Sequence, residues 1–81
     1  MKVEVLGVQN LDYVSRRSGE QVKGIMLHSC FNDSAVEGRA VESIFISDKL
    51  DLDVVYDIKP GMIVEVEYNR RGNVSNVEIC D

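Results

Sequence analysis

Two pairs of adjacent arginines are the residues whose chemistry points most directly to a ligand. Arg16-Arg17 and Arg70-Arg71 each stand in a short polar stretch that also contains a glycine. A guanidinium group is planar and presents a fork of N–H donors, so it matches the oxygens of a phosphate and can also stack on a nucleobase. Because glycine and polar residues favour turns, we expect both pairs at exposed hairpin tips.

A few further cations and aromatic rings could extend such a site. Lys23 and Arg39 would carry the basic line across a sheet, and an aromatic ring that stacks on a base contributes roughly 1–3 kcal/mol whatever the sequence. The candidate nucleic-acid-binding residues are Arg16, Arg17, Lys23, Arg39, Arg70, Arg71, Tyr13, Tyr68 and Phe31. The plainer alternative is that arginines in turns only keep the surface soluble, and that Tyr68 and Phe31 belong to the core.

The sequence predicts neither an enzyme nor a cofactor, metal or small-molecule site. It has no phosphate-binding GxxxxGK[ST] motif, no GxSxG motif, and a single histidine, His28. Cys30 and Cys80 have no CxxC spacing, so we expect free thiols in a reducing compartment. The aspartates between positions 48 and 57 do not follow the pattern of a calcium-binding loop, and a solvated acidic face is the simpler interpretation.

Composition predicts one small globular domain over residues 1–81. The chain is 44% hydrophobic, has one proline, and contains no apolar run of the length that a membrane span needs. The start Met1-Lys2-Val3-Glu4-Val5 lacks the apolar core of a signal peptide, so a soluble, cytoplasmic protein without membrane association is expected. The net charge of −5 counts against a protein that holds nucleic acid by bulk positive charge.

Alternation with a period of two residues dominates the sequence and predicts an all-β protein. We expect a long bent first strand that runs over 2–8, with a bulge or bend at Gly7, and resumes over 11–14. Four further strands are expected over 21–31, 40–47, 62–69 and 74–80. The stretch 48–59 mixes helical and strand spacing and predicts a short helical turn or an irregular connection. In the second strand, Ile25 and Leu27 should face one side and Met26 the other.

Five strands in so short a chain predict closure into a small barrel, because closure removes open sheet edges. The order of a long bent strand, a hairpin, a third strand, an interlude and a final hairpin is that of an OB (oligonucleotide/oligosaccharide-binding) barrel. In that fold, strands two and three and the two loops that would carry the arginine pairs form the binding face. An open sandwich and an SH3-style barrel are the alternatives.

The chain also resembles the filamentous-phage gene V type of single-stranded-DNA-binding protein, loosely and over most of its length. The resemblance is carried by Lys2-Val3-Glu4-Val5, Arg17-Ser18-Gly19, Pro60-Gly61 and the basic hairpin from Arg70 to Gly72. It implies an OB-fold homodimer that coats single-stranded DNA, with Arg17 and Arg70 on phosphates and the dimer contact near the last hairpin. That family stacks bases on a second-strand aromatic, whereas Ile25-Met26-Leu27 here is aliphatic.

These observations predict a non-enzymatic protein that binds single-stranded nucleic acid, DNA before RNA, in a phage, plasmid or conjugative element. The first alternative is an acidic OB-like adaptor that docks a protein of replication or DNA transfer. A second is a DNA mimic, in which the acidic stretch 48–57 and the Glu65 and Glu67 row would occupy a DNA-binding protein.

Overall fold

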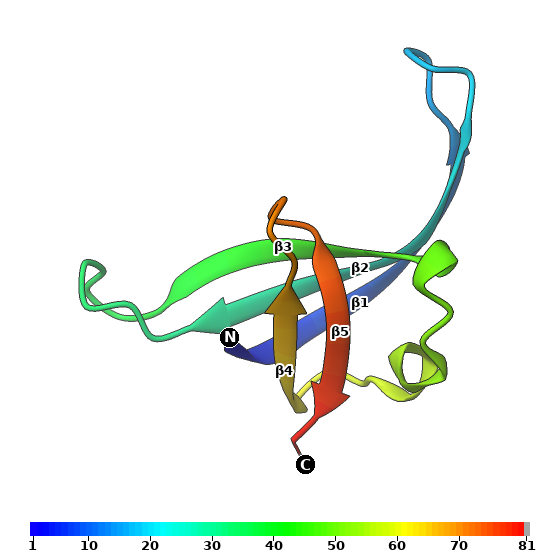
Figure 1. The fold of residues 1–81 in the computed structure, drawn as a ribbon. Coiled ribbons are helices and arrows are strands. Elements are labelled where there is room, and N and C mark those ends of the chain that lie inside the picture. Colours follow the sequence, from blue (N-terminus) through cyan, green and yellow to red (C-terminus); the bar gives the residue numbers. More distant parts are fainter. Residues whose placement is uncertain (81) are drawn as a thin grey trace.

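The protein forms one antiparallel five-stranded sheet with two short 3-10 helices in a single connection. The computed structural model describes residues 1–80. Its elements are β1 (Lys2–Val14), β2 (Gln21–Phe31), β3 (Ala40–Ser47), η1 (Asp48–Leu50), η2 (Asp53–Asp57), β4 (Ile63–Tyr68) and β5 (Val74–Ile79) (Figure 1). The all-β class and the helical turn between the third and fourth strands are confirmed. Among residues 1–80, no helix has the length and apolar character needed to cross a membrane.

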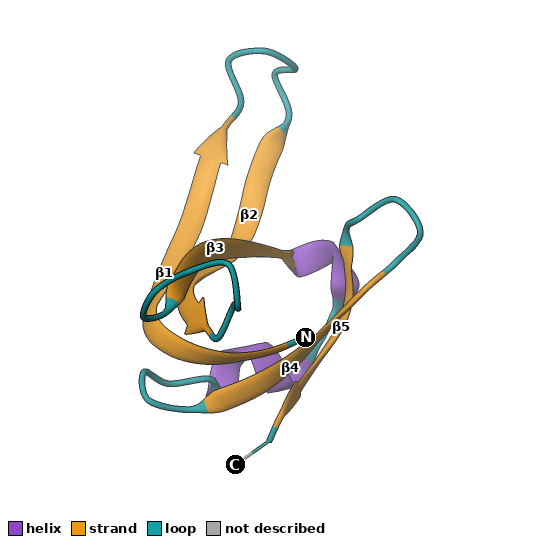
Figure 2. Ribbon diagram, turned by 90° about the vertical axis from the view of Figure 1, so that its left-hand side faces the viewer, coloured by secondary structure: helices purple, strands orange, loops and turns teal. Residues whose placement is uncertain are grey.

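The strands lie in the order β3-β2-β1-β4-β5, and every pairing is antiparallel. Strand β1 holds the sheet together, since its first residues pair with β4 and nearly its whole length pairs with β2. A register shift between Val5 and Gly7 confirms the bulge predicted at Gly7. Bulges bend a strand and increase its twist, and the sheet curls strongly around its core (Figure 2).

The predicted closure into a barrel is wrong for this structure. Within the described chain, β3 and β5 are the two ends of the strand order and do not pair with each other. The physical reason lies in the connection between β3 and β4. There η1 and η2 lie beside the gap between the sheet ends and supply the apolar cover that a β3–β5 ladder would otherwise provide (Figures 1 and 2).

The core lies on the concave face of the curled sheet. It is built from alternate strand residues, such as Ile25 and Leu27 of β2 and Ile44 and Ile46 of β3, all at most 5% exposed. The connection that holds η1 and η2 adds buried Val55 and Ile58 to the core, and its Leu50, Leu52 and Val54 pack against the core cluster. Ser47 ends β3 and caps η1, because its Oγ accepts a hydrogen bond from the Lys49 backbone N–H at 3.2 Å.

Beyond the core, the ends of β1 and β2 continue as a hairpin that projects from the body (Figure 1). Its apolar side chains are left uncovered: Tyr13 is 52% exposed and Val14 62% exposed. The molecule is accordingly elongated, with extents of 40 × 26 × 25 Å. The projecting hairpin therefore places its tip far from the core while the rest of the chain stays compact.

Candidate nucleic-acid interface

The convex face of β1, β2 and β3 is the surface that the fold leaves uncovered, and we call it the outer face. Because side chains alternate along a strand, each strand sends every second residue to it. Strand pairing places Gln9 beside Met26, Tyr13 beside Val22, and Phe45 beside Met26. The outer face consists of Glu4, Gly7, Gln9, Leu11, Tyr13, Val22, Gly24, Met26, His28, Cys30, Val41, Ser43, Phe45 and Ser47.

A row of polar contacts fixes the centre of the outer face. His28 Nε2 lies 2.9 Å from Gln9 Oε1, and His28 Nδ1 lies 3.3 Å from Ser43 Oγ, so one imidazole bridges all three strands. Next to it, the ring of Phe45 covers Gly24, and a Cβ added to Gly24 would lie 2.9 Å from the ring. The neighbouring aromatic and histidine rings are therefore held in place by the sheet, and His28 remains exposed to solvent.

The charge of the outer face differs from that of the rest of the chain. Although the protein carries a net charge of −5, Glu4 is the only acidic residue among those that make up the outer face. At the far end of β1, Glu4 is neutralised by Arg39, whose Nη1 lies 2.8 Å from the Glu4 carboxylate. The acidic residues lie elsewhere, including the exposed aspartates of the η1–η2 connection. A polyanion would therefore meet little repulsion on this face.

Both arginine pairs lie at hairpin tips, as predicted. The β1–β2 tip carries Arg16 and Arg17, and its turn is closed by a 2.9 Å hydrogen bond from the Gly19 N–H to the Ser15 carbonyl, with Gly19 at a φ of 72°. At the β4–β5 tip, the Asn69 side chain accepts hydrogen bonds from the Arg71 and Asn73 backbone N–H groups at 2.9 and 3.1 Å. Neither ion pair of residues 1–80 involves an arginine of these tips.

The two tips border different parts of the outer face. The β1–β2 tip lies at the end of the long axis of the outer face, while the β4–β5 tip lies beside the free edge of β3 (Figure 1). Gly72 and Asn73 of that tip share one groove with Ser43 and Phe45 of β3. Arg70 and Arg71 thus belong to the rim of the outer face rather than to a separate surface.

Three of the predicted site residues, Lys23, Phe31 and Tyr68, are not brought to the outer face. Lys23 lies opposite Asp12, on the side of β2 that carries Ile25 and Leu27. Phe31 packs against the core. Arg39 reaches one end of the outer face, but its guanidinium is engaged with Glu4 there. Tyr68 lies across the sheet gap, in the lining of the groove that Gly72 and Asn73 share with β3. Only Tyr13, of the three predicted aromatic rings, stands on the outer face.

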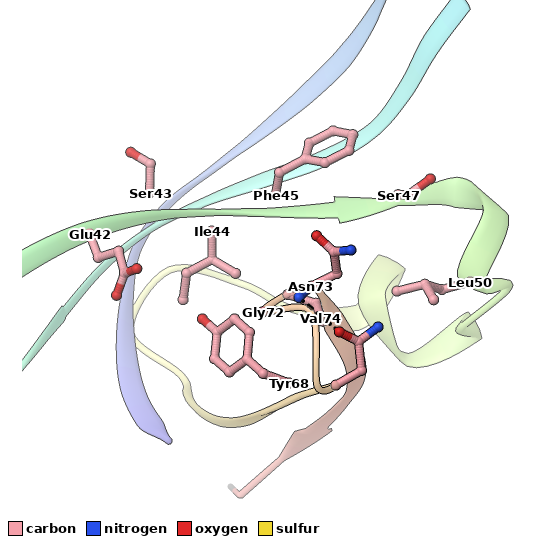
Figure 3. A pocket seen from close by; sticks show the side chains of 11 residues that line it. Glu42, Ser43, Ile44, Phe45, Ser47, Leu50, Tyr68, Gly72, Asn73 and Val74 are labelled. Atoms are coloured by element: carbon pink, nitrogen blue, oxygen red, sulfur yellow. Dashed lines mark hydrogen bonds between the residues drawn. The ribbon is translucent and has the colours of Figure 1, made fainter.

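The groove lies between the edge of β3 and the β4–β5 tip and has a volume of about 600 Å³. Figure 3 shows the Glu42 carboxylate and the Tyr68 hydroxyl side by side in it, with Ile44 pointing into the same space. Burial, and then the negative charge of Glu42, raise the pKa of Tyr68 above its ordinary value. The groove occupies the position at which a β3–β5 ladder would close a barrel.

Sequence reasoning missed His28, Met26 and Phe45 as candidate contact residues. The signal was present, because Val41, Ser43 and Phe45 alternate with the apolar Ile44 and Ile46. A ring at an outward position of a strand that already has an apolar inner row indicates either a second core or a ligand surface. In the described chain the outer face has no second layer above it (Figure 2).

No group of three or more His, Cys, Asp or Glu side chains within residues 1–80 is arranged to hold a metal ion. Cys30 is buried and Cys80 exposed, and both are free thiols. Comparison with protein-family models, with curated proteins and with solved structures found no match to this chain.

Proposed function

We propose that the protein binds single-stranded nucleic acid, with DNA as the first candidate, on the outer face of β1, β2 and β3. The observation that carries the proposal is the charge and ring content of this face. Its one acidic residue, Glu4, is neutralised by Arg39. The face presents Tyr13, His28 and Phe45, and arginine pairs stand at its end and at its rim.

The two kinds of contact serve different parts of a nucleic-acid strand. Guanidinium groups at the hairpin tips suit phosphates, and the rings between them suit exposed bases, which are available only when the strand is unpaired. Because stacking tolerates any base, binding with little sequence preference follows. The net charge of −5 disfavours contacts elsewhere on the molecule and so confines the strand to one face.

The strand order supports a more specific interpretation of the fold as an open relative of the OB barrel. In OB folds the ligand lies over strands two and three, between the loops joining strands one to two and four to five. Those loops carry the arginine pairs here. A homodimer formed near the β4–β5 hairpin, as the gene V resemblance implies, is part of the same proposal.

Fluorescence anisotropy with labelled oligo-dT, the same-length RNA and a duplex, each at two salt concentrations, tests the proposal. We expect single strands to bind and the logarithm of the association constant to fall with log salt by about 0.7 per phosphate neutralised. Arg16→Ala with Arg71→Ala should weaken binding and reduce this slope. Lys49→Ala with Lys59→Ala removes the same charge from exposed positions away from the outer face and should change both much less.

Tyr13→Ala separates stacking from charge. It should weaken binding by about 5- to 150-fold, corresponding to 1–3 kcal/mol, without altering the salt slope. Tyr56→Ala is the matched control, because Tyr56 is 68% exposed on η2. Undetectable binding to oligo-dT at low salt, or equal losses from the arginine and lysine double variants, would overturn the proposal.

A further inference from the structure

The sheet has two free edges that face each other across the groove. Strands β3 and β5 end the strand order, and the backbone groups on their outer edges have no backbone partner within residues 1–80. An unpaired strand edge is a template for another strand, and proteins usually cover or shorten such edges. Here the edge of β3 lines a groove of about 600 Å³ from Glu42 to Ser47.

We propose that this groove binds an extended segment of a partner protein, which adds a strand to the edge of β3 beside the β4–β5 hairpin. The groove borders the outer face, since Ser43, Phe45 and Ser47 belong to its lining, but Glu42 and Ile44 point into it from the concave side of β3 (Figure 3). The inference differs from nucleic-acid binding because it uses the unpaired backbone of the β3 edge. In such β-augmentation, main-chain hydrogen bonds supply affinity and alternate side chains supply specificity.

The lining determines which side chains the added strand should carry. Glu42 is the only charged residue of the lining, and Figure 3 shows its carboxylate directed into the groove beside the Tyr68 hydroxyl. Two positions further along the same face, Ile44 is 3% exposed and borders the core. Since directly opposed side chains on paired strands lie about 5 Å apart, the partner should place a Lys or Arg opposite Glu42 and an apolar residue opposite Ile44.

A second copy of this chain does not have that chemistry. Only an edge strand can pair further, and the edge strands Ala40–Ser47 and Val74–Ile79 contain no Lys or Arg; their charged residues are Glu42 and Glu78. The occupant is therefore a basic, apolar segment of a different protein.

The test uses the capped peptide Thr-Lys-Thr-Val-Thr-Val-Thr and its reversed sequence, so that both strand directions are covered. Binding is followed by NMR titration, and the site is located by hydrogen exchange of backbone amides. We expect the better direction to protect amides of β3 and the start of β5. Replacing the peptide lysine by glutamate, or methylating alternate peptide amides, should weaken binding at least about 10-fold, because each removes charge complementarity or a strand hydrogen bond.

Glu42→Lys should weaken binding of the lysine peptide by about 5- to 10-fold and should strengthen binding of the glutamate peptide. Glu37→Lys makes the same charge change in the exposed β2–β3 loop and should leave the affinity for both peptides unchanged. The inference is overturned if neither direction binds, if the methylated peptide binds as well, or if oligo-dT rather than peptide protects the β3 edge. Concentration-dependent protection of that edge without peptide would also overturn it, by showing that a second copy fills the groove. Oligo-dT binding that survives loss of peptide binding would leave the proposed function intact.

Discussion

Replacing Gly24 by alanine should destabilise the fold, because the outer face leaves no room for a side chain there. Gly24 lies in β2, opposite Ser47, and a Cβ at this position would fall well inside van der Waals contact of the Ile46 carbonyl oxygen. It would also come within 2.9 and 3.0 Å of two ring atoms of Phe45. The ring can turn aside, but the carbonyl belongs to the backbone of β3, so β2 and β3 must move apart locally.

The size of the effect follows from two opposed terms. Overpacking of this kind costs about 1–3 kcal/mol, while the change from glycine to alanine recovers about 0.4–1 kcal/mol by restricting the unfolded chain. We expect a net loss of about 1–2 kcal/mol in the free energy of unfolding. In a domain of this size, that loss lowers Tm by about 4–16 °C. Urea and thermal unfolding, followed by circular dichroism, would measure it.

Gly7→Ala is the matched control in the same sheet. A Cβ at Gly7 would meet only His28, at 3.9 Å, which is ordinary contact, and the backbone there does not have a positive φ. This variant should be neutral or slightly stabilising. Combining Gly24→Ala with Phe45→Ala should not restore stability, since the backbone clash remains. Equal stabilities for the two glycine variants would refute the close approach of β2 and β3.

Two further predictions concern titration and thiol reactivity. Because the folded-state pKa of Tyr68 is raised, first by burial and then by Glu42, its contribution to stability is complete below its ordinary value of 10.0 and is lost as pH rises through the higher folded value. In a variant whose other two tyrosines are phenylalanine, Glu42→Gln should lower the pKa of Tyr68 measured from phenolate absorbance. The pKa should stay above its ordinary value, because burial still raises it. An unchanged pKa would contradict the proximity of Tyr68 to Glu42. Of the free thiols, exposed Cys80 should react with a thiol reagent at once and buried Cys30 only on unfolding, so Cys80→Ser should abolish the fast phase.

The strands and their faces could be predicted because a period of two fixes which side each residue takes. The predicted bend at Gly7 and the inward row of Ile25 and Leu27 agree with the structure. The same rule assigns Lys23 to the inward row, so its absence from the outer face follows from alternation alone. The row of basic residues predicted across the sheet did not take this alternation into account, and it joined residues from opposite faces.

Contacts between distant parts of the chain could not be predicted in this way. The pair of Arg39 with Glu4 joins residues 35 positions apart, and only the curl of β1 and β2 brings them together. Whether β3 meets β5 depends likewise on how the connection folds. Its alternating and helical spacings are compatible with either an extended or a helical segment, and local sequence does not state how much core surface it will cover.

The connection between β3 and β4 also explains how an open sheet can still enclose a core. One end of the gap is filled, because Val55 and Ile58 are buried against the sheet and Leu50, Leu52 and Val54 pack around them. Towards Glu42 and Tyr68 the gap remains a groove, and Leu50 is the only side chain of the connection in its lining. Apolar burial therefore seals the half of the gap nearest the core, where exposed methyl groups would cost about 25 cal/mol per Å². Since stability no longer requires the β3–β5 ladder, the edge of β3 is left available for an added strand.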